Sequence, residues 1–301
     1  MKRKQYTFLF WLIPAVIVWA IGFAVAARYD LAIDQAINNT LNPIAISMEA
    51  YGAHVVFLPA VVLLGLLGFG AHRSVHILVR IGSVVCYLGG TSYMFYHGYE
   101  KLVHRGALSG SIDVKTIVLI LLWLALFGGT AYACRRISHN PRVYRKVLFW
   151  AFCGTVLLVA NQVIITGAKL VWQRTRFDDM QALGSFDNFT PWYRPLGNGG
   201  SSFPSGHTAN AVSILLPVLF CDLSEKWKPY KNMFYAFGWA YIAFMGYTRM
   251  QIGRHFLSDV LAGAGIMALV FWFLHSSSFY KKWLAVVLAG SKRKKELFYE
   301  F

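Results

Sequence analysis

Three short segments contain the residue types best suited to chemistry, and they are Lys169 to Arg176, Pro204 to His207 and Arg249 to Asp259. Guanidinium groups form forked hydrogen bonds with phosphate oxygens, and an ammonium group supplies a point charge. Lys169, Arg176 and Arg249 are therefore expected to bind one phosphoryl group and neutralise its oxygens. No cluster of carboxylates accompanies these cations, so we expect neither a metal ion nor another cofactor.

The two histidines suit two different steps of phosphoryl transfer. We expect His255 to attack phosphorus and to carry the phosphoryl group as a phosphohistidine. We expect His207 to protonate the leaving oxygen and then to activate the water. Asp259 follows His255 by four positions, which places both on one helix face, so its carboxylate is expected to fix the tautomer of the ring.

Two features predict how the backbone helps to bind the anion. Ser205 is expected near the N-cap of a helix, and the small Gly206 would let a phosphate approach unpaired backbone N–H groups. Lys169 and Arg176 lie seven positions apart, so they would share a face if one helix ran through both.

These segments resemble the three signature motifs of the type 2 phosphatidic acid phosphatase (PAP2) superfamily: Lys-x6-Arg-Pro, Pro-Ser-Gly-His and Ser-Arg-x5-His-x3-Asp. The matching positions are Lys169, Arg176, Pro204, Ser205, Gly206, His207, Arg249, His255 and Asp259. The resemblance implies a membrane core of six helices and the same roles for the two histidines and the aspartate. Phe177 replaces the usual proline and Thr248 the usual serine, which leaves loop geometry and one hydrogen bond open.

The composition indicates a membrane protein. Of the 301 residues, 57% are hydrophobic and 14% are charged, whereas soluble domains average about 25% charged. The net charge of +16 would also suit a nucleic-acid-binding protein. The basic residues lie between long apolar runs rather than in one patch, so we expect no nucleic-acid partner.

Eight apolar runs are candidate membrane spans, and they are Tyr6–Ala27, His54–Ala71, His76–His97, Val114–Cys134, Val147–Ala168, His207–Cys221, Met233–Tyr247 and Phe256–His275. We therefore predict an all-α polytopic bundle of about eight spans. Ala24-Val25-Ala26 resembles a signal-peptide cleavage site, but the first apolar run is longer than such a peptide needs.

The basic residues orient these spans. Eighteen of the 29 Lys and Arg residues, Arg73 among them, flank alternate spans or the termini, and we assign that side to the cytoplasm. The ten basic residues assigned to the outer side are Arg28, Lys101, Arg105, Lys115, Lys169, Arg174, Arg176, Arg194, Arg249 and Arg254. The three motifs then meet on the outer face, and Asp259 is the only acidic residue within an expected span.

The chain divides into three expected parts: N-terminal membrane helices (residues 1–145), a PAP2-like core (146–275) and a basic cytoplasmic tail (276–301). Several charged residues near the motifs match no motif position. We interpret Arg174, Arg194 and Arg254 as surface or headgroup contacts, and Asp178, Asp179 and Asp187 as solvated loop charges.

We predict a phosphatase in a bacterial inner membrane that hydrolyses a lipid phosphomonoester or pyrophosphate on the outer face. Undecaprenyl pyrophosphate, phosphatidylglycerophosphate, phosphatidate and lipid A all remain open as substrates. A lipid phosphotransferase is the alternative within the same chemistry. A transporter is less favoured because transporter sites lie near the bilayer midplane. Membrane lipids are the other expected partners, and the oligomeric state is left open.

Overall fold

The computed structural model is helical, and no strand occurs in the residues that it describes. These are residues 2–71, 75–195 and 199–296, with side chains described for 16–71, 75–195 and 199–289. Some of the basic residues assigned to the cytoplasmic side lie outside the described part. They are Arg73 and the side chains of Lys2, Arg3, Lys4 and residues 292–295. The all-α class predicted from the apolar runs is confirmed.

The elements in chain order, with η for a 3-10 helix, are α1 (Lys2–Ile37), α2 (Pro43–Ala50), η1 (Gly52–Phe57), α3 (Leu58–Phe69), α4 (Ile77–His104), α5 (Val114–Ser138), α6 (Pro141–Trp172), α7 (Phe177–Ala182), α8 (Gly206–Ala211), η2 (Val212–Leu215), α9 (Pro217–Leu223), η3 (Glu225–Tyr230), α10 (Lys231–Gln251), α11 (Leu257–Ser276) and α12 (Ser278–Glu296). Several starts are encoded locally. Asn42, Asp113 and Asn140 accept backbone N–H groups as N-caps of α2, α5 and α6, which satisfies donors that a helix start leaves unpaired.

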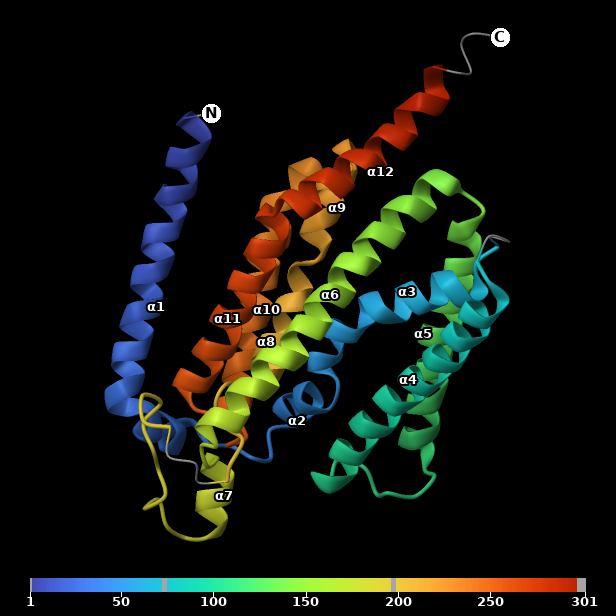
Figure 1. The fold of residues 1–301 in the computed structure, drawn as a ribbon. Coiled ribbons are helices and arrows are strands. Elements are labelled where there is room, and N and C mark those ends of the chain that lie inside the picture. The colour runs from blue at the N-terminus through green and yellow to red at the C-terminus, as the bar shows by residue number, and fades with distance from the viewer. Residues whose placement is uncertain (1, 72–74, 196–198, 297–301) are drawn as a thin grey trace.

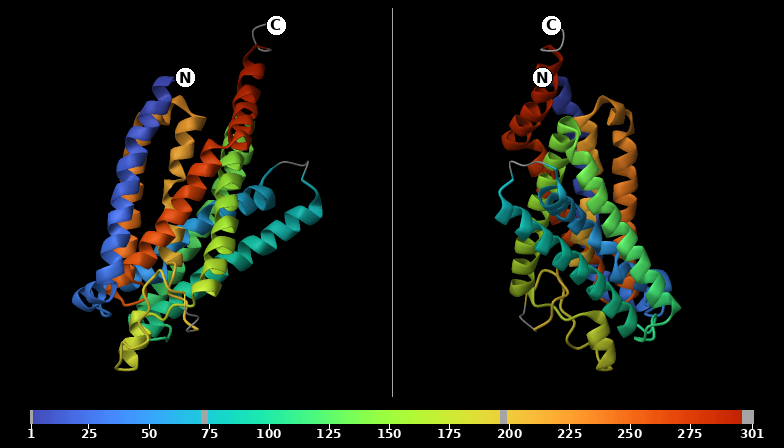
Figure 2. Two further views of the ribbon diagram at one scale, coloured as in Figure 1. Left: turned by 60° about the vertical axis from the view of Figure 1, so that its left-hand side comes forward. Right: turned by 90° about the vertical axis from the view of Figure 1, so that its right-hand side faces the viewer.

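The long helices run back and forth between two ends of the molecule (Figure 1). The start of α1 and the end of α12 lie at one end, and the turn after α1, the α4–α5 connection and the described residues between α6 and α8 lie at the other (Figures 1 and 2). We call this second end, which holds residues 38–42, 105–113, 173–195, 199–205 and 252–256, the site end.

Within the described residues, seven stretches are long and apolar enough to cross a membrane, and they are Val16–Ile37, Pro43–Phe69, Ile77–His104, Val114–Ser138, Pro141–Ala182, Gly206–Leu223 and Leu257–Ser276. Each corresponds to one of the eight expected spans. The remaining run, Met233–Tyr247, forms α10, a helix of 21 residues that lies outside this set. Its tyrosines, tryptophan and glycines contribute little hydropathy, although they still pack as a helix.

Among the described residues, two of the three clusters of buried apolar side chains join the long helices to one another. The larger one joins α6, α8, α9, α10 and α11 around residues such as Leu157, Leu219 and Met245. A separate core, which includes Val61 and Tyr87, joins α3, α4 and α5. Helix α1 packs along α11 (Figure 1). The site end is therefore framed both by the motif-bearing helices and by the helices that precede them.

Helix α1 carries buried acidic residues that the apolar runs did not predict. It continues ten residues beyond the expected end at Ala27, so Asp30 and Asp34 lie in an apolar helix and are 2% and 0% exposed. Glu49, in the stretch Pro43–Phe69, is 4% exposed. The prediction that Asp259 is the only acidic residue within a span is wrong, because the apolar windows stopped short of these three.

Candidate active site

His255 lies in the turn between α10 and α11, and it is 3% exposed. Its Nδ1 is 2.7 Å from the carbonyl oxygen of Ser202 and 3.7 Å from Oδ2 of Asp259. A carbonyl oxygen only accepts hydrogen bonds, so it keeps the ring proton on Nδ1 and leaves the lone pair on Nε2. Within the described ranges, Nε2 makes no hydrogen bond. Ser202, rather than Asp259 alone, therefore orients the ring.

The surroundings keep the His255 ring neutral. Burial lowers the pKa of His255 to about 3, and the positive charges of Lys169 and Arg249 also lower it, against the opposing effect of Asp259. The neutral ring is the nucleophilic form, since protonation would occupy the lone pair on Nε2.

Asp259 is fully buried and accepts several hydrogen bonds. Arg174 Nη1 donates to its Oδ1 at 2.6 Å, the backbone N–H of Phe256 donates to Oδ2 at 2.9 Å, and the Ser202 hydroxyl also donates to Oδ2. These donors hold the carboxylate ionised and fixed near His255. Ser202 thus contacts His255 through its carbonyl oxygen and Asp259 through its hydroxyl.

Arg174 is a buried structural residue, which corrects its interpretation as a surface or headgroup contact. It is 2% exposed, and its Nη2 donates to Asp30 Oδ2 at 3.0 Å. Its Nε donates to the carbonyl oxygen of Thr190 at 2.8 Å, and its guanidinium lies 4.2 Å from the ring centre of Phe256. Arg174 therefore links α1 to the carboxylate beside His255, a contact that no local pattern in the chain predicts.

Lys169 and Arg176 meet, but not on one helix face. Helix α6 ends at Trp172, and Gln173 adopts a left-handed conformation with φ of 43°. The two cations are instead brought together by Ser201. Lys169 Nζ donates to its carbonyl oxygen, and Arg176 Nη2 donates to its hydroxyl at 2.8 Å.

Arg249 has donors that the protein does not satisfy. It is 2% exposed, and its Nη2 lies 3.3 Å from Glu49 Oε1. Its Nε and Nη1, and also Nε of Arg176, are buried without an acceptor among the described residues. Buried guanidinium donors normally have partners, so an oxyanion such as phosphate would supply the acceptors they lack.

His207 and Ser205 lie where α8 begins. His207 Nε2 is 3.0 Å from the carbonyl oxygen of Glu49. Ser205 caps α8 through Thr208 N, as expected, and its own N–H donates to the Asp259 carbonyl oxygen at 2.9 Å. A Cβ on Gly263 would lie 2.3 Å from the Ser205 oxygen. Glycine at this position of α11 therefore permits the close approach of the two motifs.

Gly206 has space on its open side. A Cβ placed on it would meet Lys169 Cε at 3.8 Å and Ile165 Cγ2 at 3.9 Å, which are ordinary contacts. Because Gly206 has no side chain, room is left between the start of α8 and the Lys169 ammonium group, where a phosphate would have to fit.

Other charged residues near the motifs divide into two groups. Arg254 is paired, with Nη1 2.8 Å from Asp178 Oδ2 and Nε 3.5 Å from Glu49 Oε1, so the surface interpretations of Arg254 and Asp178 are wrong. Arg194 and Asp187 are exposed, as expected of a surface contact and a solvated loop charge, whereas the exposed Asp179 lies in helix α7 rather than in a loop.

The two departures from the motif pattern have local explanations. Phe177 is 2% exposed and packs on Phe186 and Phe256 with ring centres 5.2 and 6.4 Å away. The Thr248 hydroxyl donates to the Met245 carbonyl oxygen within its own helix at 2.8 Å. Phe177 thus stabilises the loop by packing, and Thr248 contributes no group to the site.

Comparison with known proteins agrees with this geometry. Residues 148–283 match the model of the PAP2 superfamily. We call these matched residues the PAP2 segment. It contains all of the residues predicted to act in the site, whereas Asp30 and Glu49 precede the PAP2 segment. Within the described ranges, no group of three or more His, Cys, Asp or Glu side chains is arranged to share a metal ion.

Two curated relatives of this chain are lipid phosphatases by name. Phosphatidylglycerophosphatase B of Bacillus subtilis is 28% identical over 128 residues, which cover 36% of this chain and 63% of the relative. Lipid A 4'-phosphatase of Porphyromonas gingivalis is 32% identical over 89 residues, which cover 29% of this chain and 34% of the relative. The matches thus span less than two thirds of either relative, and no solved structure matches the chain.

Proposed function

We propose that this protein is a membrane-embedded, metal-independent phosphatase that removes a phosphoryl group from a lipid through a phosphohistidine on His255. The observation that carries this proposal is the pair of buried donors on Arg249, Nε and Nη1, which have no acceptor among the described residues. They belong to the same site as the neutral His255, whose Nε2 is free. Phosphoryl transfer to nitrogen requires both a nucleophilic nitrogen and donors for the phosphoryl oxygens.

In the first step, Nε2 of His255 attacks phosphorus while the bond to the leaving oxygen breaks. Lys169, Arg176 and Arg249 bind the phosphoryl oxygens, whose charge they neutralise as it redistributes. The ring becomes cationic, and Asp259, with Oδ2 3.7 Å from Nδ1, stabilises this charge. The Ser202 carbonyl oxygen accepts the hydrogen bond from Nδ1 throughout.

His207 handles the proton of the leaving group. Its Nε2 donates to the Glu49 carbonyl oxygen at 3.0 Å, so the acid form of His207 is the imidazolium, which carries the transferred proton on Nδ1. In the first step Nδ1 donates this proton to the lipid oxygen, and the dephosphorylated lipid leaves. In the second step Nδ1 takes a proton from water, which attacks phosphorus, breaks the P–N bond and releases inorganic phosphate.

A lipid is the proposed substrate because the site lies at the ends of apolar helices. The site end is flanked by seven stretches apolar enough to cross a membrane, so a headgroup anchored in the bilayer can reach it. The names of the two relatives support the same class of substrate. The charge distribution of the chain favours a site that faces away from the cytoplasm, and the bacterial sources of both relatives favour a bacterial inner membrane.

Phosphate release by purified protein tests this proposal, with phosphatidate, phosphatidylglycerophosphate, undecaprenyl pyrophosphate and lipid A as substrates. Wild-type protein should release phosphate from at least one of them, with and without a chelator, and His255→Ala should not. His139→Ala is a matched control, because His139 is exposed at the opposite end of the molecule.

Three outcomes would contradict parts of the proposal. Activity in His255→Ala would exclude this histidine as the nucleophile, and activity lost with the chelator would exclude a metal-independent reaction. A phosphoryl group recovered on a second lipid instead of in solution would identify a phosphotransferase.

A further inference from the structure

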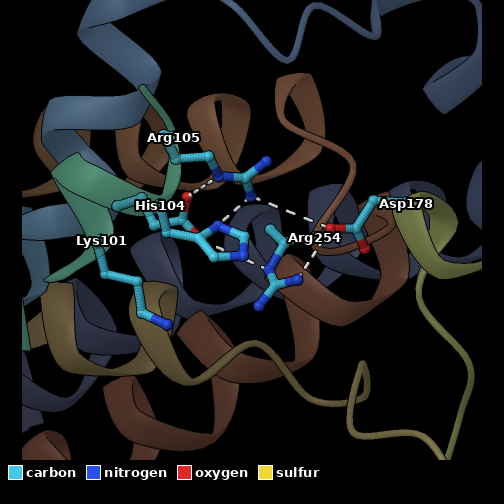
Figure 3. A pocket seen from close by; sticks show the side chains of 6 residues that line it. Lys101, His104, Arg105, Asp178 and Arg254 are labelled. Carbon is cyan, nitrogen blue, oxygen red and sulfur yellow. Dashed lines mark hydrogen bonds and ion pairs between the residues drawn. The ribbon is translucent and has the colours of Figure 1, made fainter. Parts of the chain in front are cut away.

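A pocket of about 160 Å³ opens at the site end, and its lining residues are Glu49, Lys101, His104, Arg105, Asp178 and Arg254. Figure 3 shows Lys101, His104 and Arg105, which come from the end of α4, grouped with Arg254 and Asp178 from the PAP2 segment. Helix α4 lies outside that segment. The pocket is thus a feature of this chain's N-terminal helices together with its catalytic core.

Ion pairs fix one part of the pocket wall. Arg105 Nε is 2.8 Å from Glu49 Oε2, and Arg254 Nη1 is 2.8 Å from Asp178 Oδ2. Arg105 Nη2 also lies 4.0 Å from Asp178 Oδ2 (Figure 3). Both carboxylates are therefore neutralised by arginines, and they are not available to balance further cations.

Lys101 and His104 are the remaining polar groups of the wall. In the part of the chain that the structure describes, neither side chain makes a hydrogen bond or an ion pair. Lys101 is half-buried on α4, and His104 is exposed. The pocket therefore has an unbalanced ammonium group and a free imidazole on one side, which suits an anion with several oxygens.

The pocket adjoins the proposed phosphate site. Glu49 Oε1 contacts Arg249 Nη2 at 3.3 Å on one side and Arg254 Nε at 3.5 Å on the other. Arg254 also immediately precedes His255 in the chain. A ligand whose phosphoryl group contacts Arg249 would therefore extend its next charged group toward Lys101.

We propose that this pocket binds a second phosphate group of the substrate headgroup, so that the enzyme prefers lipids with two phosphates to simple phosphomonoesters. This inference rests on the proposed phosphatase function and specifies its substrate. Lys101 and His104 would contact the second phosphate directly, and Arg105 and Arg254 would form the charged wall behind it.

Binding and turnover of two lipids with the same acyl chains test this inference. Phosphatidylglycerophosphate carries two phosphates and phosphatidate carries one. In Lys101→Gln/His104→Asn, kcat/KM for phosphatidylglycerophosphate should fall about ten-fold, the loss expected for a charge-assisted hydrogen bond, and kcat/KM for phosphatidate should change less than about two-fold. Lys115→Gln is the control, since Lys115 is also exposed at the site end but lies outside the pocket.

Equilibrium binding separates this inference from the proposed function. In a His255→Ala background, which needs no turnover, the same double substitution should weaken binding of phosphatidylglycerophosphate about ten-fold and leave phosphatidate unchanged. Equal losses for the two lipids, or no loss for either, would overturn the inference. A weaker inhibition by inorganic phosphate with unchanged lipid preference would assign the pocket to the released product and would also overturn it.

Discussion

Arg174 and Asp259 form a buried ion pair, with Nη1 2.6 Å from Oδ1 and side chains that are 1% and 0% exposed. The same guanidinium contacts Asp30 of α1 at 3.0 Å. Asp259 in turn lies beside Nδ1 of His255. A helix outside the PAP2 segment is thus connected to the proposed nucleophile through Arg174 and Asp259, in three successive contacts.

Arg174→Gln should destabilise the protein by about 3–5 kcal/mol, because it leaves two buried carboxylates without their cation. Thermal unfolding in detergent would measure the loss. Adding Asp30→Asn should recover part of it, since the two residues interact directly. Arg194→Gln, at an exposed loop arginine, is the control. Additive effects of Arg174→Gln and Asp30→Asn would contradict the coupling.

Arg249→Lys should lower kcat by about 100-fold, because an ammonium group cannot replace two forked donors that are aimed at developing charge. The folded state should persist, since the lysine keeps the charge opposite Glu49. Phosphate release and the unfolding temperature should be measured together. A variant with full kcat would show that Arg249 Nε and Nη1 do not bind the phosphoryl group.

The low pKa of His255 predicts a pH-dependent contribution to stability. The unfolded chain binds a proton on this ring below about pH 6.5, whereas burial lowers the pKa in the folded protein to about 3. Stability is therefore lost as the pH falls from about 6.5 toward 3, by about 2 kcal/mol at pH 5. His255→Gln should lack this part of the loss, so its unfolding temperature should fall less between pH 7 and pH 5.

The exposed His139 provides the comparison for this measurement, since His139→Gln should follow the wild-type pH profile. If His255→Gln also follows the wild-type profile, the ring is not held neutral by the fold.

Gly263→Ala should destabilise the junction between α8 and α11 by about 1–3 kcal/mol, because its Cβ would lie 2.3 Å from the Ser205 oxygen and the backbone would have to move. Gly128→Ala in α5 is matched to it, since a Cβ there meets nothing within 4 Å. Unfolding temperatures and kcat of both variants would be compared. Equal behaviour of the two alanines would contradict the close approach.

The sequence by itself determined the helical class, most of the membrane-spanning runs and the residues of the three motifs. These properties are local: hydropathy over about 20 residues specifies a span, and motif spacing needs no knowledge of distant contacts. Even the cap at Ser205 could be predicted, since the Ser205 side chain accepts the N–H of Thr208, three positions later.

The charges that surround the motifs are known only from the tertiary structure. Arg174 meets Asp30 across 144 positions, and Arg249 meets Glu49 across 200. Such pairs leave no periodic signal, because their energies depend on packing that places distant segments at one end of the molecule. For the same reason, Lys169 and Arg176 could be paired by spacing, but the turn at Gln173 and the role of Ser201 could not be predicted.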